Sequence, residues 1–167
     1  MRRRKDDVRV HAFTRKFDQI SSVLISFCYI SGVETEEMPN DTPQSRALWD
    51  TGATSSCISR EKAEEINLEP IGRTLLNGVL GSGYTNVYLI NLLLTNGVRA
   101  KNLPVAEINV KTNPDEDEKF DVLVGMDVIN QGDFAISNRG KETVFTFRMP
   151  SMERFDFVRD LKKSRKR

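Results

Sequence analysis

The sequence predicts an all-β domain, closed or sandwiched, that carries one or two short helices. Three observations lead to this fold class. Stretches rich in β-branched and aromatic residues are short and numerous, turn signals such as Asn-Gly and Asn-Arg-Gly separate them, and segments with helical spacing are few and short. Many short strands with frequent turns are typical of a sheet that closes on itself or packs on a second sheet.

Length, composition and charge indicate one ordinary globular domain with tails. The chain has 167 residues, of which 38% are hydrophobic and 29% are charged, and this balance is typical of proteins that close a core. The formal net charge of +1 does not favour nucleic acid or an acidic substrate as a partner. Basic runs at residues 1–5 and 162–167 are interpreted as solvated tails, and contact with nucleic acid or an anionic surface is the alternative.

The N-terminal part of the chain predicts a leader, two strands and a loop. Residues 1–18 are polar and basic, and we expect them to form a loose leader. Residues 20–31 are rich in β-branched and aromatic types and predict a strand that ends at Gly32. Residues 33–43 are acidic and contain prolines, which indicates an exposed loop. Residues 45–49 predict a second, short strand.

The middle of the chain predicts one helix followed by β-structure. Residues 59–68 have helical character, with Ser59 as the N-cap. Residues 73–110 predict strands throughout, because Asn77-Gly78 and Asn96-Gly97 are strong hairpin-turn dipeptides and the residues between them are mostly apolar.

The last third predicts three strands and two helical segments. Residues 120–124 indicate a buried strand that stops at Gly125, and residues 126–130 fit one helical turn. Two strands and a C-terminal amphipathic helix follow, and the packing of that helix, on its own domain or on a partner subunit, stays open. The expected organisation is a polar basic leader, a folded domain, and a C-terminal amphipathic helix with a basic tail, over residues 1–18, 19–150 and 151–167.

Neither a membrane span nor a disulfide framework is indicated. A span needs about 20 apolar residues, and the longest apolar stretch, residues 20–30, is short and interrupted by serines. The cysteines Cys28 and Cys57 stand in apolar surroundings, which indicates buried free thiols, with a redox effect of Cys57 on dimerisation as the alternative. We therefore expect a cytoplasmic protein with no membrane partner.

The chemistry is concentrated in residues 47–54, Ala-Leu-Trp-Asp-Thr-Gly-Ala-Thr. A short apolar strand delivers Asp50, and the small residues after it let the backbone pass close to whatever the carboxylate faces. Because side chains alternate along a strand, Trp49 should point away from Asp50 and into the core. Asp-Thr-Gly alone is a weak signal, and Asp50 as a turn residue that bonds its own backbone is the alternative.

A second segment strengthens the first. Residues 120–129 give an apolar strand, Gly125 and a short helix, 75 residues after Asp50. Between the two lies a glycine-rich hairpin, Asn77-Gly78-Val79-Leu80-Gly81-Ser82-Gly83. In this order of elements the chain, over roughly residues 20–148, resembles the retroviral-type aspartic proteases, especially their single-domain cellular and bacterial members.

The resemblance implies a closed acid-protease barrel with one lobe in each chain. Asp50 would be the catalytic carboxylate, and Thr51, Gly52 and Ala53 would form the supporting loop. Thr51 would bond across the dimer axis, Gly52 would leave room for the substrate backbone, and Gly125 would seat its strand beside the loop. The hairpin tip at residues 78–81 would bind substrate as a flap, that is Gly78, Val79, Leu80 and Gly81, although an ordinary flexible tip is the alternative.

The chain departs from the retroviral pattern at two positions. Those enzymes usually carry an acid directly after the alanine and an arginine directly after the second glycine, and the two side chains pair. Here the positions hold Thr54 and Met126. Both partners are absent together, so no charge is buried without its partner, but the dimer must be braced in a different way.

The physics of a carboxylate pair supports a homodimer independently of the resemblance. Hydrolysis of an amide needs a base to activate water and an acid to protonate the leaving nitrogen, and two carboxylates about 3 Å apart share one proton and serve both needs. The chain has one Asp-Thr-Gly, so a two-fold axis would supply the second. No metal or cofactor is required, and the single histidine, His11, gives little support to a Ser-His or Cys-His triad.

The sequence therefore predicts an aspartic endopeptidase that acts on peptide or protein substrates as a homodimer. Two alternatives come from other classes. One is a non-catalytic dimerisation or peptide-binding module with the same fold, and an intact Asp-Thr-Gly argues against it. The other is a segment of a longer polyprotein whose basic ends are linkers or nucleic-acid arms, which neighbouring nucleic-acid-binding or polymerase segments would favour.

Overall fold

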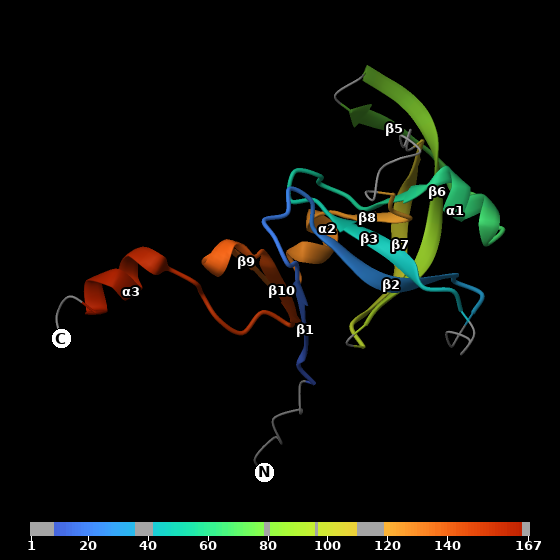
Figure 1. Cartoon of the computed structure of the whole chain (residues 1–167). Coiled ribbons are helices and arrows are strands. Elements are labelled where there is room, and N and C mark those ends of the chain that lie inside the picture. The colour runs from blue at the N-terminus through green and yellow to red at the C-terminus, as the bar shows by residue number, and fades with distance from the viewer. Residues whose placement is uncertain (1–8, 36–41, 79–80, 96, 110–118, 165–167) are drawn as a thin grey trace, which may run out of the picture.

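In the computed structural model, six strands form a closed barrel (Figure 1). The structure describes residues 9–35, 42–78, 81–95, 97–109 and 119–164. Each barrel strand pairs with the next, and the last pairs with the first, so that the ring has no open edge. In spatial order the strands are β2 (Ile25–Gly32), β3 (Ser45–Trp49), β8 (Val122–Val124), β4 (Cys57–Ser59), β7 (Arg99–Ile108) and β6 (Gly81–Leu94). The predicted all-β fold with a closed barrel is confirmed.

A hairpin extends the barrel on one side. Strand β5 (Gly72–Gly78) pairs with the first half of β6 alone, and in Figure 1 the two project beyond the barrel. Gly78 is paired with Gly81, so the predicted Asn77-Gly78 turn begins later than expected and Val79 and Leu80 lie outside the described residues. The turn predicted at Asn96-Gly97 is confirmed by Gly97, which has a φ of 86° between β6 and β7.

A separate three-stranded antiparallel sheet packs beside the barrel. It has the order β1 (His11–Lys16), β10 (Val144–Met149) and β9 (Asp133–Ser137). The prediction of a loose leader is therefore wrong for residues 11–16. This short segment has a mostly polar composition, but β10 supplies hydrogen bonds along its whole length.

The helices are short and occupy the predicted places. Helix α1 (Arg60–Glu65) begins after Ser59, whose Oγ accepts a hydrogen bond from the Lys62 N–H at 3.2 Å. Helix α2 (Met126–Ile129) follows Gly125, a 3₁₀ turn η1 (Arg139–Lys141) links β9 to β10, and α3 (Phe157–Ser164) lies near the C-terminus. Within the described ranges, none of these helices is long and apolar enough to cross a membrane.

The strand predicted over residues 20–31 begins later, at Ile25. Ser21 explains the delay, because its Oγ donates to the Val23 carbonyl at 2.5 Å and its N–H donates to Thr143 Oγ1 at 2.9 Å. One local and one long-range bond hold the start of the segment in a bend, next to the residue that precedes β10.

An aromatic cluster joins the barrel to the second sheet. Trp49 stacks on Phe134 at 5.6 Å between ring centroids and meets Phe147 at 5.0 Å. Phe13 and Phe145 complete the cluster, and Phe145 and Phe147 are 0% exposed. As predicted, Trp49 points into the core, where its Nε1–H donates to Ser26 Oγ at 2.9 Å. The cluster therefore fixes the strand that leads directly into Asp50.

The Trp49 environment gives a spectroscopic prediction. Because one chain alone buries the indole, the fluorescence of the folded protein should be blue-shifted in a dilute monomer as well as in any dimer. Steady-state emission across a concentration series, with a sample unfolded in denaturant as the hydrated reference, tests this. Emission at the wavelength of hydrated indole in the folded protein would contradict the position of β3.

Candidate functional site

Asp50 directly follows β3, which is paired with β8. Parallel pairing places Trp49 opposite Val124 on β8, and the Asp50 N–H donates to the Val124 carbonyl at 3.0 Å. The next turn closes when the Ala53 N–H donates to the Asp50 carbonyl at 3.3 Å. The backbone that carries the carboxylate is thus fixed from both sides.

The loop after Asp50 lies at the protein surface. Thr51 and Gly52 are exposed, and the Gly52 N–H donates to Asp50 Oδ1 at 2.7 Å. This is the local backbone bond considered as an alternative role for Asp50. It uses one of two carboxylate oxygens, so it orients the side chain and is compatible with catalysis at the other oxygen.

Gly125 contacts the Asp50 loop so closely that no side chain fits there. A Cβ on Gly125 would lie 2.7 Å from the Ser55 carbonyl carbon and 3.0 Å from the Ala53 oxygen. Immediately beyond it, the Met126 N–H donates to the Ala53 carbonyl at 2.9 Å. The two motifs, far apart in sequence, are therefore brought together through backbone atoms.

A second contact between the same two segments was not predicted. Asp127 accepts two hydrogen bonds from Ser56, from Oγ at 2.7 Å and from N–H at 2.9 Å. Ser56 Oγ in turn accepts from the Gly125 N–H at 3.1 Å. Ser56 is fully buried, so this network couples α2 to the loop where water is excluded.

The Ser56–Asp127 pair lies close to the positions where the chain departs from the retroviral pattern. Thr54 is exposed, and Met126 packs partly buried against the core. Each member of the new pair stands within two residues of one of these positions. The sequence does show a polar residue near each of the two positions. That Ser56 pairs with Asp127, 71 residues away, could not be assigned without the fold.

The buried cysteine beside the loop is a neutral thiol. Burial raises the pKa of Cys57 to about 11, and the negative charges of Asp127 and Asp50 act in the same direction. Burial likewise raises the pKa of Cys28, and both thiols are free. The prediction of buried free thiols is confirmed.

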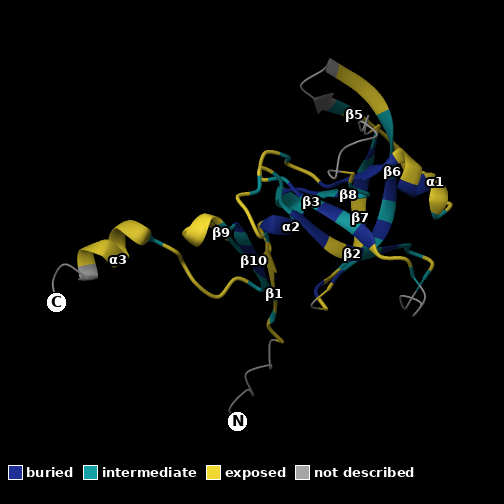
Figure 2. Cartoon of the chain, in the orientation of Figure 1, coloured by how far each residue is buried: buried dark blue, intermediate teal, exposed yellow. Residues whose placement is uncertain are grey.

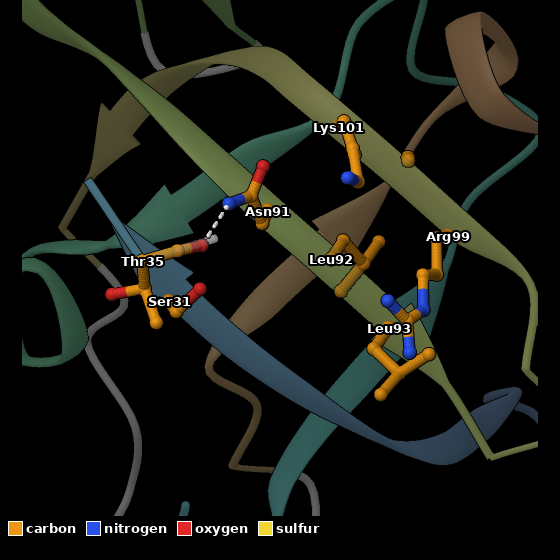
Figure 3. A pocket seen from close by; sticks show the side chains of 8 residues that line it. Ser31, Thr35, Asn91, Leu92, Leu93, Arg99 and Lys101 are labelled. Atoms are coloured by element: carbon orange, nitrogen blue, oxygen red, sulfur yellow. Dashed lines mark hydrogen bonds between the residues drawn. The ribbon is translucent and has the colours of Figure 1, made fainter. Parts of the chain in front are cut away.

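The pocket that Figure 3 shows is separate from the Asp50 loop. The small pocket in Figure 3 lies over β2, β6 and β7, where Asn91 Nδ2 donates to the Thr35 carbonyl at 3.2 Å. In the part of the chain that the structure describes, no three His, Cys, Asp or Glu side chains gather in a way that could hold a metal ion.

Comparison with known proteins decides the family. The family model described as aspartyl protease matches residues 37–128, more than half of the chain, and spans both the Asp50 loop and Gly125. The chain belongs to the aspartyl protease family. Members hydrolyse peptide bonds within a chain, so this enzyme is an aspartic-type endopeptidase, as predicted. A comparison with curated proteins gives no match.

A solved structure supports the fold of this aspartyl protease, and two others show a weaker likeness. A retropepsin-like aspartic protease from Rickettsia conorii is 14% identical, with a TM-score of 0.51 over 84% of this chain and 96% of that one. The EIAV protease, solved with the inhibitor HBY-793, is 17% identical over 66% of this chain and 88% of that one, with a TM-score of 0.46. The simian foamy virus protease is 18% identical over 64% and 92%, with a TM-score of 0.40.

The close contact at Gly125 gives a mutational prediction for this protease. Gly125→Ala should destabilise the fold by about 1–3 kcal/mol, because the new methyl group overlaps backbone atoms of the Asp50 loop. Activity per folded molecule should also fall, since the loop must shift. Thermal unfolding and turnover of the purified variant measure both effects.

Gly72→Ala is the matched control, because a Cβ at Gly72 meets nothing within 4 Å. Its stability should stay within about 0.5 kcal/mol of the parent. Equal effects of the two substitutions would show that the contact at Gly125 has no special importance.

Proposed function

We propose that this endopeptidase acts as a homodimer in which Asp50 of each chain contributes to one active site. The observation that supports this most directly is the position of the Asp50 loop. One chain supplies a single catalytic carboxylate, on a loop that is braced from within but exposed at residues 51, 52, 54 and 55. A two-fold axis beside the loop would cover it and bring the second carboxylate to the first.

The shared site would hydrolyse a peptide bond without a covalent intermediate. Two carboxylates in contact keep one proton between them, so one accepts a proton from the attacking water while the other protonates the leaving nitrogen. The peptide carbonyl would lie over the pair.

The neighbouring residues have supporting roles in this proposal. Thr51 would bond across the axis and hold the two loops in register, and Gly52 would let the substrate backbone approach. Ala53 and Gly125 would fix the loop on α2. The hairpin that ends at Gly78 and Gly81 would close over the bound peptide as a flap, and its projection beyond the barrel is compatible with that movement (Figure 1).

The expected partners and location follow from the same chemistry. The substrate would be a peptide or protein chain, and neither a cofactor nor a metal is needed for the carboxylate pair. Two buried free thiols are compatible with a reducing compartment such as the cytoplasm.

Replacement of Asp50 tests the shared site. Asp50→Asn is nearly isosteric and should leave folding and dimerisation intact, but turnover should fall by about 10²–10⁴-fold or more because the pair loses its acid–base function. Mixed with wild type under subunit exchange, the variant should form inactive heterodimers. Wild-type activity should therefore fall with the square of the wild-type fraction, at a fixed total concentration well above the dimer constant.

A linear fall in that titration would mean that each chain works alone. Asp127→Asn is unsuitable as a control because it disrupts the hydrogen bonds with Ser56. Glu69→Gln, at an exposed position between α1 and β5, should leave the activity of every mixture unchanged.

The carboxylate pair also predicts a bell-shaped dependence of activity on pH. Only the singly protonated pair is active, so kcat/KM should fall on the acidic side as the pair gains its second proton and on the basic side as it loses its last. The optimum should lie between acidic and near-neutral pH. A rate that rises steadily into alkaline solution, or that is lost on adding a chelator, would contradict the mechanism.

A further inference from the structure

The C-terminal arm, residues 151–164, exposes an unusual amount of apolar surface. Phe157 is 76% exposed and Val158 64%, and residues 157–162 of α3 are coloured as exposed in Figure 2. The other large apolar side chains that the arm exposes are Met152, Phe155 and Leu161. Apolar side chains gathered in this way on one short segment mark a surface that another surface covers.

Helix α3 needs contact with another surface to be stable. An isolated helix shorter than about 12–15 residues is marginal in water, and α3 has eight. Phe157, Val158 and Leu161 lie along one side of it, at the i, i+1, i+4 spacing of a buried helix face. Figure 1 shows α3 standing clear of the barrel and of β9 and β10, so its own domain does not provide the cover.

The root of the arm is fixed to β9 of the second sheet. Asp133 on β9 accepts hydrogen bonds from Ser151 Oγ and from the Met152 N–H, at 2.5 and 2.7 Å, and forms an ion pair with Arg148. The Ser151 hydroxyl and then the Met152 N–H hold the pKa of Asp133 well below its usual range. The carboxylate therefore stays charged in mild acid, where it can still accept the hydrogen bonds from Ser151 and Met152.

A complementary surface lies elsewhere on the chain. A cleft of about 750 Å³, here called the β1–β2 cleft, lies along the connection between those strands. Its apolar lining includes Phe17, Ile20, Ile25 and Phe27. Ile20 is 55% exposed and Phe27 38%, so the cleft offers uncovered apolar surface to a helix face.

Charge also matches between the two surfaces. Arg15, Lys16 and Arg46 line the cleft together with one acid, Asp18, and Lys16 Nζ is ion-paired with Glu142 at 2.8 Å. The Arg15 guanidinium lies 5.3 Å from the centroid of the Phe27 ring. On the arm, Asp160 borders the apolar side of α3, and its Oδ1 lies 4.0 Å from Nε of Arg159, which is on the opposite side. An acid at the edge of the apolar face would meet the basic rim of the cleft.

We propose that the arm of each chain binds the β1–β2 cleft of a second copy, so that the two chains of the protease exchange arms. This proposal rests on the homodimer of the proposed function and names a surface that holds it together. The second copy is the occupant that the chain itself demands, because one chain supplies half of the active site and presents both the arm and the cleft. Reciprocal arms would double each contact across the two-fold axis.

Cross-linking between two singly substituted chains tests the contact directly. Val158→Cys on one chain and Ile20→Cys on another change exposed positions, and the native cysteines are buried. Mild oxidation of the mixed full-length proteins should give a covalent heterodimer at a yield well above that of either protein alone. A mixture that cross-links no better than its components would overturn the proposal.

The dimer constant, measured by sedimentation, gives a second test. Phe157→Ser with Val158→Ser should raise it about tenfold or more, because each arm loses two apolar side chains that the cleft would bury. Ile136→Ser, at an exposed apolar position on β9 outside the arm and the cleft, should not change it. Asp160→Lys should weaken the dimer and Arg15→Glu should do the same, but the two charge reversals combined should restore part of the affinity.

The outcomes distinguish this proposal from its alternatives. If the apolar arm variant leaves the dimer constant unchanged while the Asp50→Asn titration stays quadratic, the arm proposal is wrong and the shared site stands. If the arm variant instead loses binding to phosphatidylserine vesicles without any change in dimerisation, the arm is an interfacial membrane helix and the proposal is overturned.

Discussion

The rest of the site depends on the backbone contact between Gly125 and the Asp50 loop. A chain segment can approach another this closely only where one of them has no side chain, and the approach lets Met126 and Ala53 form a hydrogen bond at 2.9 Å. Once the segments meet, Ser56 and Asp127 come close enough to form two hydrogen bonds, which join the segments further. The geometry of Asp50 is thus set by residues more than 70 positions further along the chain.

The second sheet acts on the same loop through packing. Phe13, Phe145 and Phe147 come from the two ends of the sequence and contact the ring of Trp49, which directly precedes Asp50. Removal of β1 or of β10 would therefore leave a cavity beside the indole. Such a cavity would destabilise β3, the strand that leads into Asp50. The barrel carries the Asp50 loop, and the second sheet packs against the strand that leads into it.

Local patterns in the sequence predict most of the elements and the core of the site. Strand alternation, hairpin dipeptides and the N-cap at Ser59 are properties of neighbouring residues, and the structure has β3, α1, α2, β9 and β10 where these patterns indicate them. What the sequence does not predict depends on distant partners. The strand β1 is stabilised by β10, the Ser56–Asp127 pair joins two loops, and the ring closes where β2 meets β6, none of which has a local signature.

The position of β8 within the ring has a consequence for biosynthesis. This strand, residues 122–124, lies between β3 and β4, so the ring stays open until the last quarter of the domain has been made. A nascent or truncated chain that ends before it lacks the carbonyl that accepts from Asp50, and also the glycine that seats the loop. Since domains fold as units during synthesis, the Asp50 loop can take its final position only late, after residues 122–125 have been made.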